Sequence, residues 1–87
     1  MIGITVFSTQ VCPKCKRLKE WLEAEGISFT QESMESPAGM TELRVNGCFA
    51  LEAPVLKVGD KFIESRDLFN KLEIKKDEIL SIIKESQ

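Results

Sequence analysis

The segment Cys12-Pro13-Lys14-Cys15 limits the possible folds of this 87-residue chain most strongly, because the stretches on its two sides have different patterns. Residues 2–7 before it are rich in β-branched and aromatic side chains and predict a strand. Residues 16–25 after it are strong helix formers, and their apolar positions recur at helical spacing. The two cysteines are therefore expected on a strand-to-helix turn, with Pro13 in the first turn of the helix.

The start of a helix favours a reactive cysteine. Unpaired backbone N–H groups and the helix dipole stabilise negative charge there, and so favour the thiolate of Cys12. Lys14, Lys16 and Arg17 add positive charge around the same sulfur, and such surroundings lower the pKa of a cysteine. We therefore predict that Cys12 is a nucleophile. A solvated helix face is the simpler interpretation of the three cations, and it is compatible with this role.

The chain after Gly26, a predicted helix C-terminus, continues to alternate between strand and helix patterns. Residues 27–31 predict a short strand, and Ser36-Pro37 predicts a helix that ends near Asn46-Gly47. Two apolar strands follow at residues 54–58 and 61–63, and the Gly-Asp pair between them predicts a hairpin.

Two further helices are expected after this hairpin. Ser65 is predicted to cap a helix that runs through Leu72, and Asp77 to cap an amphipathic helix within a helical tail at residues 72–87. This tail is expected to dock on the domain, and a partner-binding helix is the alternative. The element order is then βαβαββα with an extra C-terminal helix. A βαβ unit implies parallel strands and a hairpin adds antiparallel ones, so the fold class is α/β with a mixed four-stranded sheet flanked by helices.

Composition and charge fit one small domain over residues 1–87. Hydrophobic residues make up 43% of the chain, and no segment is long enough to span a membrane. Acidic and basic residues are interspersed at a net charge of −2, so no nucleic-acid-binding face is expected. The N-terminal sequence has no secretory pattern, which favours a cytoplasmic location. In that reducing compartment three cysteines indicate redox or metal chemistry rather than structural disulfides.

The same cysteines also allow other interpretations. A structural zinc site usually has four Cys or His ligands, and only Cys48 remains because the chain has no histidine. An iron–sulfur site, or a scaffold in which the dithiol is structural, is a further alternative. We interpret Cys48 as a buried, inert side chain, and a position near the active face is the alternative. Trp21 is expected to pack in the core.

The Cys-Pro-Lys-Cys turn, the element order and Ala53-Pro54 at the start of a strand together make the chain similar to a glutaredoxin of the thioredoxin superfamily, over roughly residues 1–72. The resemblance implies a thioredoxin-like fold and a monomeric enzyme that needs no bound cofactor. It also implies that the Ala53–Pro54 peptide bond is cis and that Pro54 lies against the dithiol. The backbone of Ala53 would then be free to pair with the main chain of a substrate.

The activity that this resemblance implies is thiol–disulfide exchange with protein disulfides. Cys12 would attack the target disulfide, and Cys15 would resolve the mixed disulfide. The candidate substrate-binding residues are Lys14, Ala53, Pro54 and Arg66.

Three features depart from the pattern of glutathione-using glutaredoxins. That pattern has a basic residue three positions before the first cysteine, an aromatic residue between the cysteines and a Gly-Gly pair, whereas this chain has Thr9, Lys14 and Glu64-Ser65. The carboxylate of Glu64 disfavours a glutathione carboxylate unless Arg66 compensates. We therefore predict weak glutathione use. The chain also resembles small glutaredoxin-like redoxins, which receive electrons from a thioredoxin-reductase-like or ferredoxin-linked enzyme and pass them to enzymes such as ribonucleotide reductase.

Overall fold

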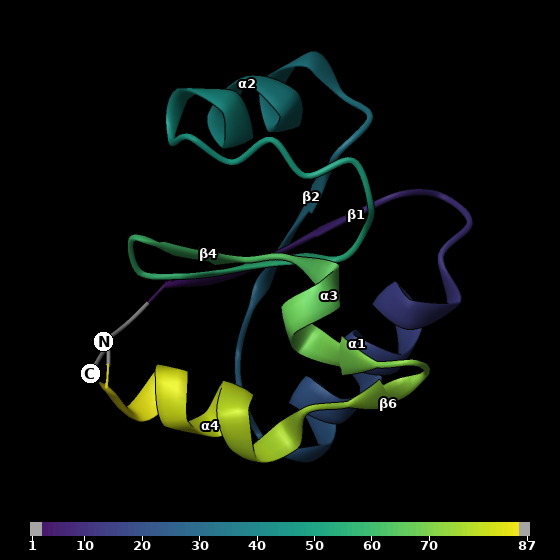
Figure 1. Cartoon of the computed structure of the whole chain (residues 1–87), viewed down its shortest axis with the longest axis vertical. Coiled ribbons are helices and arrows are strands. Elements are labelled where there is room, and N and C mark those ends of the chain that lie inside the picture. The colour runs from purple at the N-terminus through teal and green to yellow at the C-terminus, as the bar shows by residue number, and fades with distance from the viewer. Residues whose placement is uncertain (1–2, 86–87) are drawn as a thin grey trace.

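A mixed four-stranded sheet forms the centre of the computed structural model, which describes residues 3–85 (Figure 1). Its strands are β1 (Ile4–Ser8), β2 (Thr30–Ser33), β3 (Val55–Val58) and β4 (Lys61–Ile63), in the order β2-β1-β3-β4. Strand β1 pairs with β2 in parallel and with β3 in antiparallel orientation, and β3 pairs antiparallel with β4. The predicted fold class is therefore confirmed. Position 2 of the first predicted strand lies outside the described residues.

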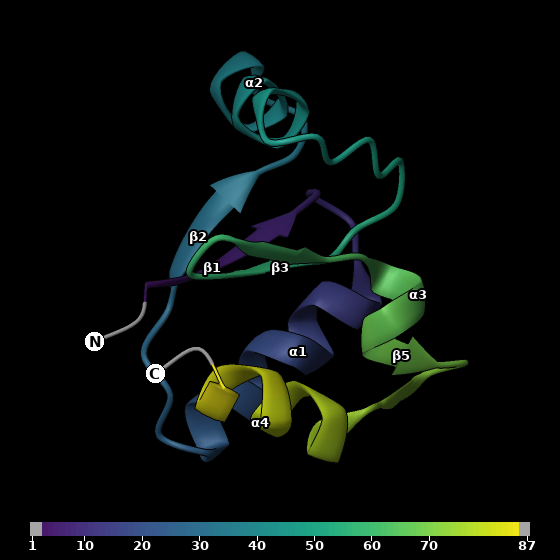
Figure 2. The ribbon, with the colours of Figure 1, turned by 60° about the vertical axis from the view of Figure 1, so that its left-hand side comes forward.

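Helix α1 (Pro13–Ala24) follows β1 and lies on one face of the sheet (Figure 2). Its capping residue is Cys12, and Pro13 takes the first helical position, where the missing N–H of proline is not needed. Beyond the C-terminal end, Gly26 has a φ of 71°, a left-handed conformation that glycine adopts without steric cost. Helix α1 thus begins and ends as the sequence predicts.

Helix α2 (Pro37–Val45) covers the opposite face of the sheet (Figure 1). The hydroxyl of Ser36 caps it by accepting a hydrogen bond from the backbone N–H of Gly39 at 3.1 Å. Gly39 also allows a close approach to β2, because a Cβ at this position would overlap the backbone oxygen of Ser33. The predicted start and end of this helix are confirmed.

The second strand is displaced from its predicted position. The sequence pattern placed it at residues 27–31, but β2 covers residues 30–33 and pairs in parallel with β1. Ile27 and Phe29 are half-buried and pack against the core from the preceding loop. Their alternation therefore reflects side-chain burial and not strand pairing. The residues of β2 are all exposed. The hydroxyls of Thr5 in β1 and Thr30 in β2 form a hydrogen bond between the two strands at 2.9 Å.

The segment after β4 differs most from the prediction. Helix α3 (Ser65–Leu68) has Glu64 as its capping residue, so Ser65 is the first helical residue and not the cap. The helix also ends at Leu68 rather than at Leu72, because Phe69 is in extended conformation and buries its ring in the core. Strands β5 (Phe69–Asn70) and β6 (Glu73–Ile74) then form a small antiparallel hairpin that the sequence did not predict.

Helix α4 (Lys76–Glu85) closes the described part of the chain. It begins at Lys76, so Asp77 lies in the first turn and is not the cap that we predicted. A carboxylate there still interacts favourably with the helix dipole. The predicted tail extends to residues 86–87, which lie outside the described residues. The helix docks on the domain through Ile79 and Ile83, as predicted for the tail.

The sheet separates two apolar clusters, because alternate side chains of a strand point to opposite faces. Val6 belongs to the cluster on the side of α1, α3 and α4, and Phe7 to the cluster on the side of α2. Trp21 packs in the first cluster, as predicted. Cys48 is buried in the second, which confirms that it is a core residue. Within residues 3–85, none of the helices has the length and apolar character needed to cross a membrane.

Candidate active site

A disulfide joins Cys12 and Cys15 at the start of α1, with their Cα atoms 5.2 Å apart. Cys12 is extended, with a φ of −149° and a ψ of 94°, and it is the capping residue of the helix. The backbone N–H of Cys15 donates a hydrogen bond to the Cys12 Sγ at 3.1 Å. The sulfur therefore takes the acceptor position that a serine or aspartate oxygen takes at most helix starts. This arrangement places a backbone N–H that has no partner within the helix against the sulfur that would carry the negative charge after reduction.

The two sulfurs differ in their access to solvent. Cys15 is only 1% exposed, whereas Cys12 is half-buried. An open depression of ≈ 490 Å³ reaches both cysteines, and Thr9 and Val11 form part of its wall. A molecule that approaches through this depression can reach Cys12 more easily than Cys15. The difference in exposure favours Cys12 as the attacking residue.

Two lysines line this depression, and only one of them is among the residues predicted to add positive charge there. Lys16 and Lys19 line the depression together with the cysteines. Lys14 is turned toward the β5–β6 hairpin, where its ammonium lies 5.8 Å from the ring centroid of Phe69. The first turn of α1 contains no acidic residue. The dithiol is therefore flanked by lysines with no carboxylate in the same turn.

The Ala53–Pro54 peptide bond is cis, which confirms the isomer that the resemblance implied. Pro54 is fully buried and immediately precedes β3, whose first residue, Val55, pairs with Phe7 near the end of β1. The loop that carries the cysteines leaves β1 from this same end. The topology therefore brings the cis-proline and the dithiol to one end of the sheet. A substrate-binding role for Ala53 and Pro54 stays a prediction.

A second depression, of ≈ 470 Å³, lies between residues 49–52 and the start of α3. Arg66, one of the predicted substrate-binding residues, is at its wall and is 3.9 Å from the carboxylate of Glu64. Neither Arg66 nor Lys14 lines the depression that contains the cysteines. The hydroxyl of Ser65 is buried without a hydrogen-bond partner among the described residues. The structure thus separates Arg66 from the immediate wall around the dithiol.

The loop before the cis-proline contributes features that the sequence analysis missed. Phe49 and Leu51 are 68% and 89% exposed, and Val11, directly before the first cysteine, is 90% exposed. Arg44 positions this loop by donating a hydrogen bond to the carbonyl of Cys48 at 3.0 Å and by lying 5.5 Å from the ring centroid of Phe49. In the sequence these positions are only apolar residues in irregular segments. Such a pattern does not show whether a side chain lies on the surface or in the core.

A hydrogen bond to the neighbouring β2–α2 connection holds the loop that carries the cysteines. The backbone N–H of Gln10 donates a hydrogen bond to a carboxylate oxygen of Glu35 at 3.0 Å. This bond joins the segment just before Cys12 to the connection between β2 and α2.

Within the described ranges, no group of three or more His, Cys, Asp or Glu side chains is arranged to hold a metal ion.

Comparisons with known proteins identify a family from the sequence and similar folds among solved structures. A family model described as glutaredoxin matches residues 4–63, which is more than half of the chain. The chain is similar in structure to glutaredoxin 1 from Francisella tularensis, solved as a complex with cacodylate, with a TM-score of 0.61, 20% identity, and coverage of 93% of this chain and 99% of that one. It is also similar to a glutaredoxin from Archaeoglobus fulgidus, with a TM-score of 0.61, 23% identity, and coverage of 95% and 86%. No curated protein matched.

Proposed function

The chain belongs to the glutaredoxin family, and from this premise we propose that it is a thiol–disulfide oxidoreductase that reduces protein disulfides through Cys12 and Cys15. One observation carries the proposal: the Sγ of the more accessible cysteine, Cys12, caps a helix and accepts the backbone N–H of Cys15 at 3.1 Å. A donor held in this position stabilises a thiolate once the disulfide has been reduced. The thiolate is the form of cysteine that attacks disulfides.

The reaction begins with the reduced protein. The Cys12 thiolate attacks one sulfur of the target disulfide, the target S–S bond breaks, and the departing target thiolate takes a proton from water. The Cys15 thiol loses its proton and attacks the Cys12 sulfur of this mixed disulfide. The second target sulfur leaves as a thiol, and the protein retains the Cys12–Cys15 disulfide. Two electrons pass to the target, and an external reductant returns them to the protein.

Substrate recognition is proposed to use the face around the dithiol. The backbone of Ala53, next to the cis peptide bond, pairs with the main chain of the target, as the family resemblance implies. Lys14 and Arg66 supply positive charge on the flanks of this face. Arg66 is 79% exposed in its side chain and lies next to Glu64, so its charge is partly offset by a carboxylate.

For the electron donor, we propose a thioredoxin-reductase-like or ferredoxin-linked enzyme in place of glutathione. Thr9, which has no charge, lines the depression beside Cys12. Glu64 adds a carboxylate at the start of α3, and its ion pair with Arg66 uses the cation that would otherwise face a glutathione carboxylate. Both features support weak binding of glutathione and leave recognition to a protein donor.

The proposal is tested by turnover. Catalytic amounts of the protein are added to insulin and dithiothreitol, and the rate of disulfide reduction is compared with that of the Cys12→Ser variant. We expect many turnovers for the natural protein and none above background for the variant. Reaction that stops at one equivalent would contradict the proposed function.

The choice of donor is tested in a parallel assay. Oxidised protein is mixed either with glutathione and glutathione reductase or with a thioredoxin reductase, and NADPH oxidation is followed. Efficient turnover is expected only with the second donor, because the glutathione-binding groups are replaced. Rapid, saturable turnover with glutathione would contradict this part of the proposal while leaving the dithiol activity intact.

A further inference from the structure

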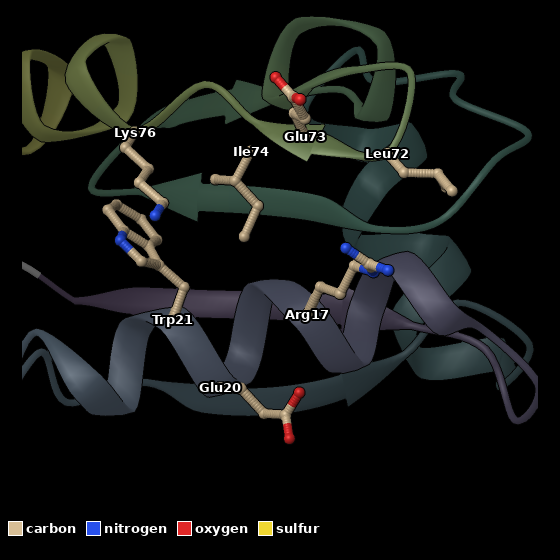
Figure 3. Close-up of a pocket in the computed structure, with 7 residues that line it drawn as sticks. All are labelled: Arg17, Glu20, Trp21, Leu72, Glu73, Ile74 and Lys76. Carbon is tan, nitrogen blue, oxygen red and sulfur yellow. The ribbon is translucent and has the colours of Figure 1, made fainter.

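A groove of ≈ 510 Å³ runs between α1 and the β5–β6 hairpin and is separate from the depression that contains the cysteines. Its apolar wall consists of Trp21 from α1, a core residue that is 9% exposed, and of Leu72 and Ile74 from the hairpin. Figure 3 shows the side chains of Trp21 and Ile74 extending into the space between the helix and the hairpin. Leu72 is 54% exposed, so part of this apolar surface is open to solvent.

Two cations enter this groove, one from each side. In Figure 3 the guanidinium of Arg17 lies below Leu72, and the ammonium of Lys76 lies beside Trp21. The two carboxylates of the lining, Glu20 and Glu73, extend away from the space. The side chains therefore give the groove a positive, apolar interior, although the lining as a whole has equal numbers of both charges.

Arg17 and Lys76 have no carboxylate partner within 4.0 Å among residues 3–85. In contrast, Lys57, Lys61 and Arg66 each lie within that distance of a carboxylate. The positive charges of the groove are thus available to a molecule that carries carboxylates. An apolar wall between two available cations is complementary to an apolar side chain with acidic neighbours.

The groove lies within reach of a polypeptide held at the dithiol. At a helical rise of 1.5 Å per residue, Arg17 and Trp21 lie about 7.5 and 13.5 Å along the helix from Cys12. An extended chain advances about 3.3 Å per residue. Residues about two to four positions from the reacting cysteine of a bound target therefore reach the groove. Lys14, which lies between the two cysteines, places its ammonium 5.8 Å from the ring centroid of Phe69, so the hairpin lies next to the first turn of α1.

We propose that this groove binds a segment of the protein substrate in which carboxylates flank an apolar side chain, a few residues from the reacting cysteine. This inference rests on the proposed function, because it names the class of substrate that the same dithiol reduces. The apolar side chain contacts Trp21 and Leu72, and the carboxylates pair with Arg17 and Lys76.

Trp21 provides a direct measurement of this binding. It is the one tryptophan in a chain without tyrosine, so its fluorescence reports on the groove. The oxidised protein is titrated with a cysteine-free peptide that has a leucine between two glutamates, and with a matched peptide that has glutamines instead. We expect the acidic peptide to change the fluorescence with saturation, and to bind more tightly at low salt than at high salt because exposed charges are screened. The glutamine peptide should bind more weakly.

Variants locate the binding site. Arg17→Gln or Lys76→Gln should weaken binding of the acidic peptide by about two- to fivefold, the range for an exposed ion pair. Leu72→Ser removes exposed apolar contact and should weaken both peptides by about threefold or more. Lys84→Gln is the matched control, because this exposed lysine of α4 does not line the groove. It should leave the affinity unchanged.

The outcomes separate this inference from the proposed function. The peptides contain no disulfide, so their binding does not depend on catalysis, and turnover of insulin by the natural protein is measured independently. Absence of a saturable signal, equal binding of the two peptides, or equal losses for Lys76→Gln and Lys84→Gln would each overturn the groove assignment. None of these results would affect the dithiol activity. Charge reversal by Lys76→Glu should instead shift the preference toward a peptide with lysines in place of glutamates.

Discussion

A variant in which Cys12 carries the only thiol allows the effect of the helix N-terminus on the pKa of that thiol to be measured. In a variant with Cys15→Ser and Cys48→Ala, the backbone N–H at position 15 is retained, and it donates to the Cys12 Sγ at 3.1 Å in the natural protein. We expect the pKa of the Cys12 thiol to lie below that of a free cysteine, about 8.5. The physical causes are the N–H donor, the helix dipole and the lysines beside the depression.

The size of the effect follows from these contacts. A hydrogen bond to a charged acceptor contributes about 1.5–3 kcal/mol, and the helix N-terminus about 0.3–1 kcal/mol. Lys16 and Lys19 are surface residues, so each contributes at most about 1 kcal/mol. A stabilisation of about 1.4 kcal/mol changes the thiolate ratio tenfold. At the lower end of these contributions the thiolate ratio rises more than tenfold, so a substantial fraction of Cys12 should be thiolate at neutral pH, where a free cysteine is only a few per cent ionised.

The assay is the rate of alkylation by iodoacetamide as a function of pH, and its midpoint is expected at least about one pH unit below that of a free cysteine. High salt should move this midpoint only slightly, because the N–H bond is local whereas surface charges are screened. Since the folded pKa is lowered, the associated stabilisation of the reduced protein is present above about pH 8.5 and is lost as the pH falls through the folded pKa. A midpoint near that of free cysteine would refute the argument, and a midpoint that returns there in high salt would assign the effect to the lysines.

Three further predictions test the packing and the alternatives. Gly39→Ala should lower the free energy of unfolding by about 1–3 kcal/mol in urea titrations because its Cβ overlaps the Ser33 oxygen; a gain in stability, as for an ordinary helix glycine, would contradict this contact. Cys48→Ala should retain full insulin turnover but lose about 1 kcal/mol of stability, since the side chain is buried and does not line the depression that contains the other two cysteines; loss of turnover would give Cys48 a catalytic role. Treatment of the reduced protein with a chelator should leave its circular dichroism unchanged, and unfolding would favour a metal site.

The parts of the fold that the sequence predicts are those where local chemistry and burial agree. Cys12 and Pro13 mark the start of α1, and Ser36 caps α2. In each case the residue caps the helix or occupies its first position, and this role depends only on residues that are close in the sequence. The position where the helix begins can therefore be predicted from the local sequence. The cis bond before Pro54 came from the family resemblance, because cis and trans X–Pro bonds differ by only about 0.5–1 kcal/mol.

The missed elements are those that only the tertiary structure determines. An apolar pattern at Leu68, Phe69 and Leu72 suits a helix, but the structure buries the ring of Phe69 in an extended segment and turns the chain at Lys71, which has a φ of 60°. The sequence therefore did not predict the β5–β6 hairpin, or the groove that it forms with α1. The sequence placed both Lys14 and Lys16 around the Cys12 sulfur, and it did not show that Lys14 faces this hairpin while Lys16 lines the depression that contains the cysteines.

The central claim is that Cys12 attacks target disulfides, and trapping the mixed disulfide tests it most directly. The reduced Cys15→Ser variant is incubated with an oxidised protein substrate, and the adduct is mapped by mass spectrometry after digestion. We predict a stable mixed disulfide at Cys12, because the half-buried sulfur at the helix start attacks and the resolving thiol has been removed. An adduct at Cys48, or no adduct under conditions that trap one with a known dithiol oxidoreductase, would contradict the account.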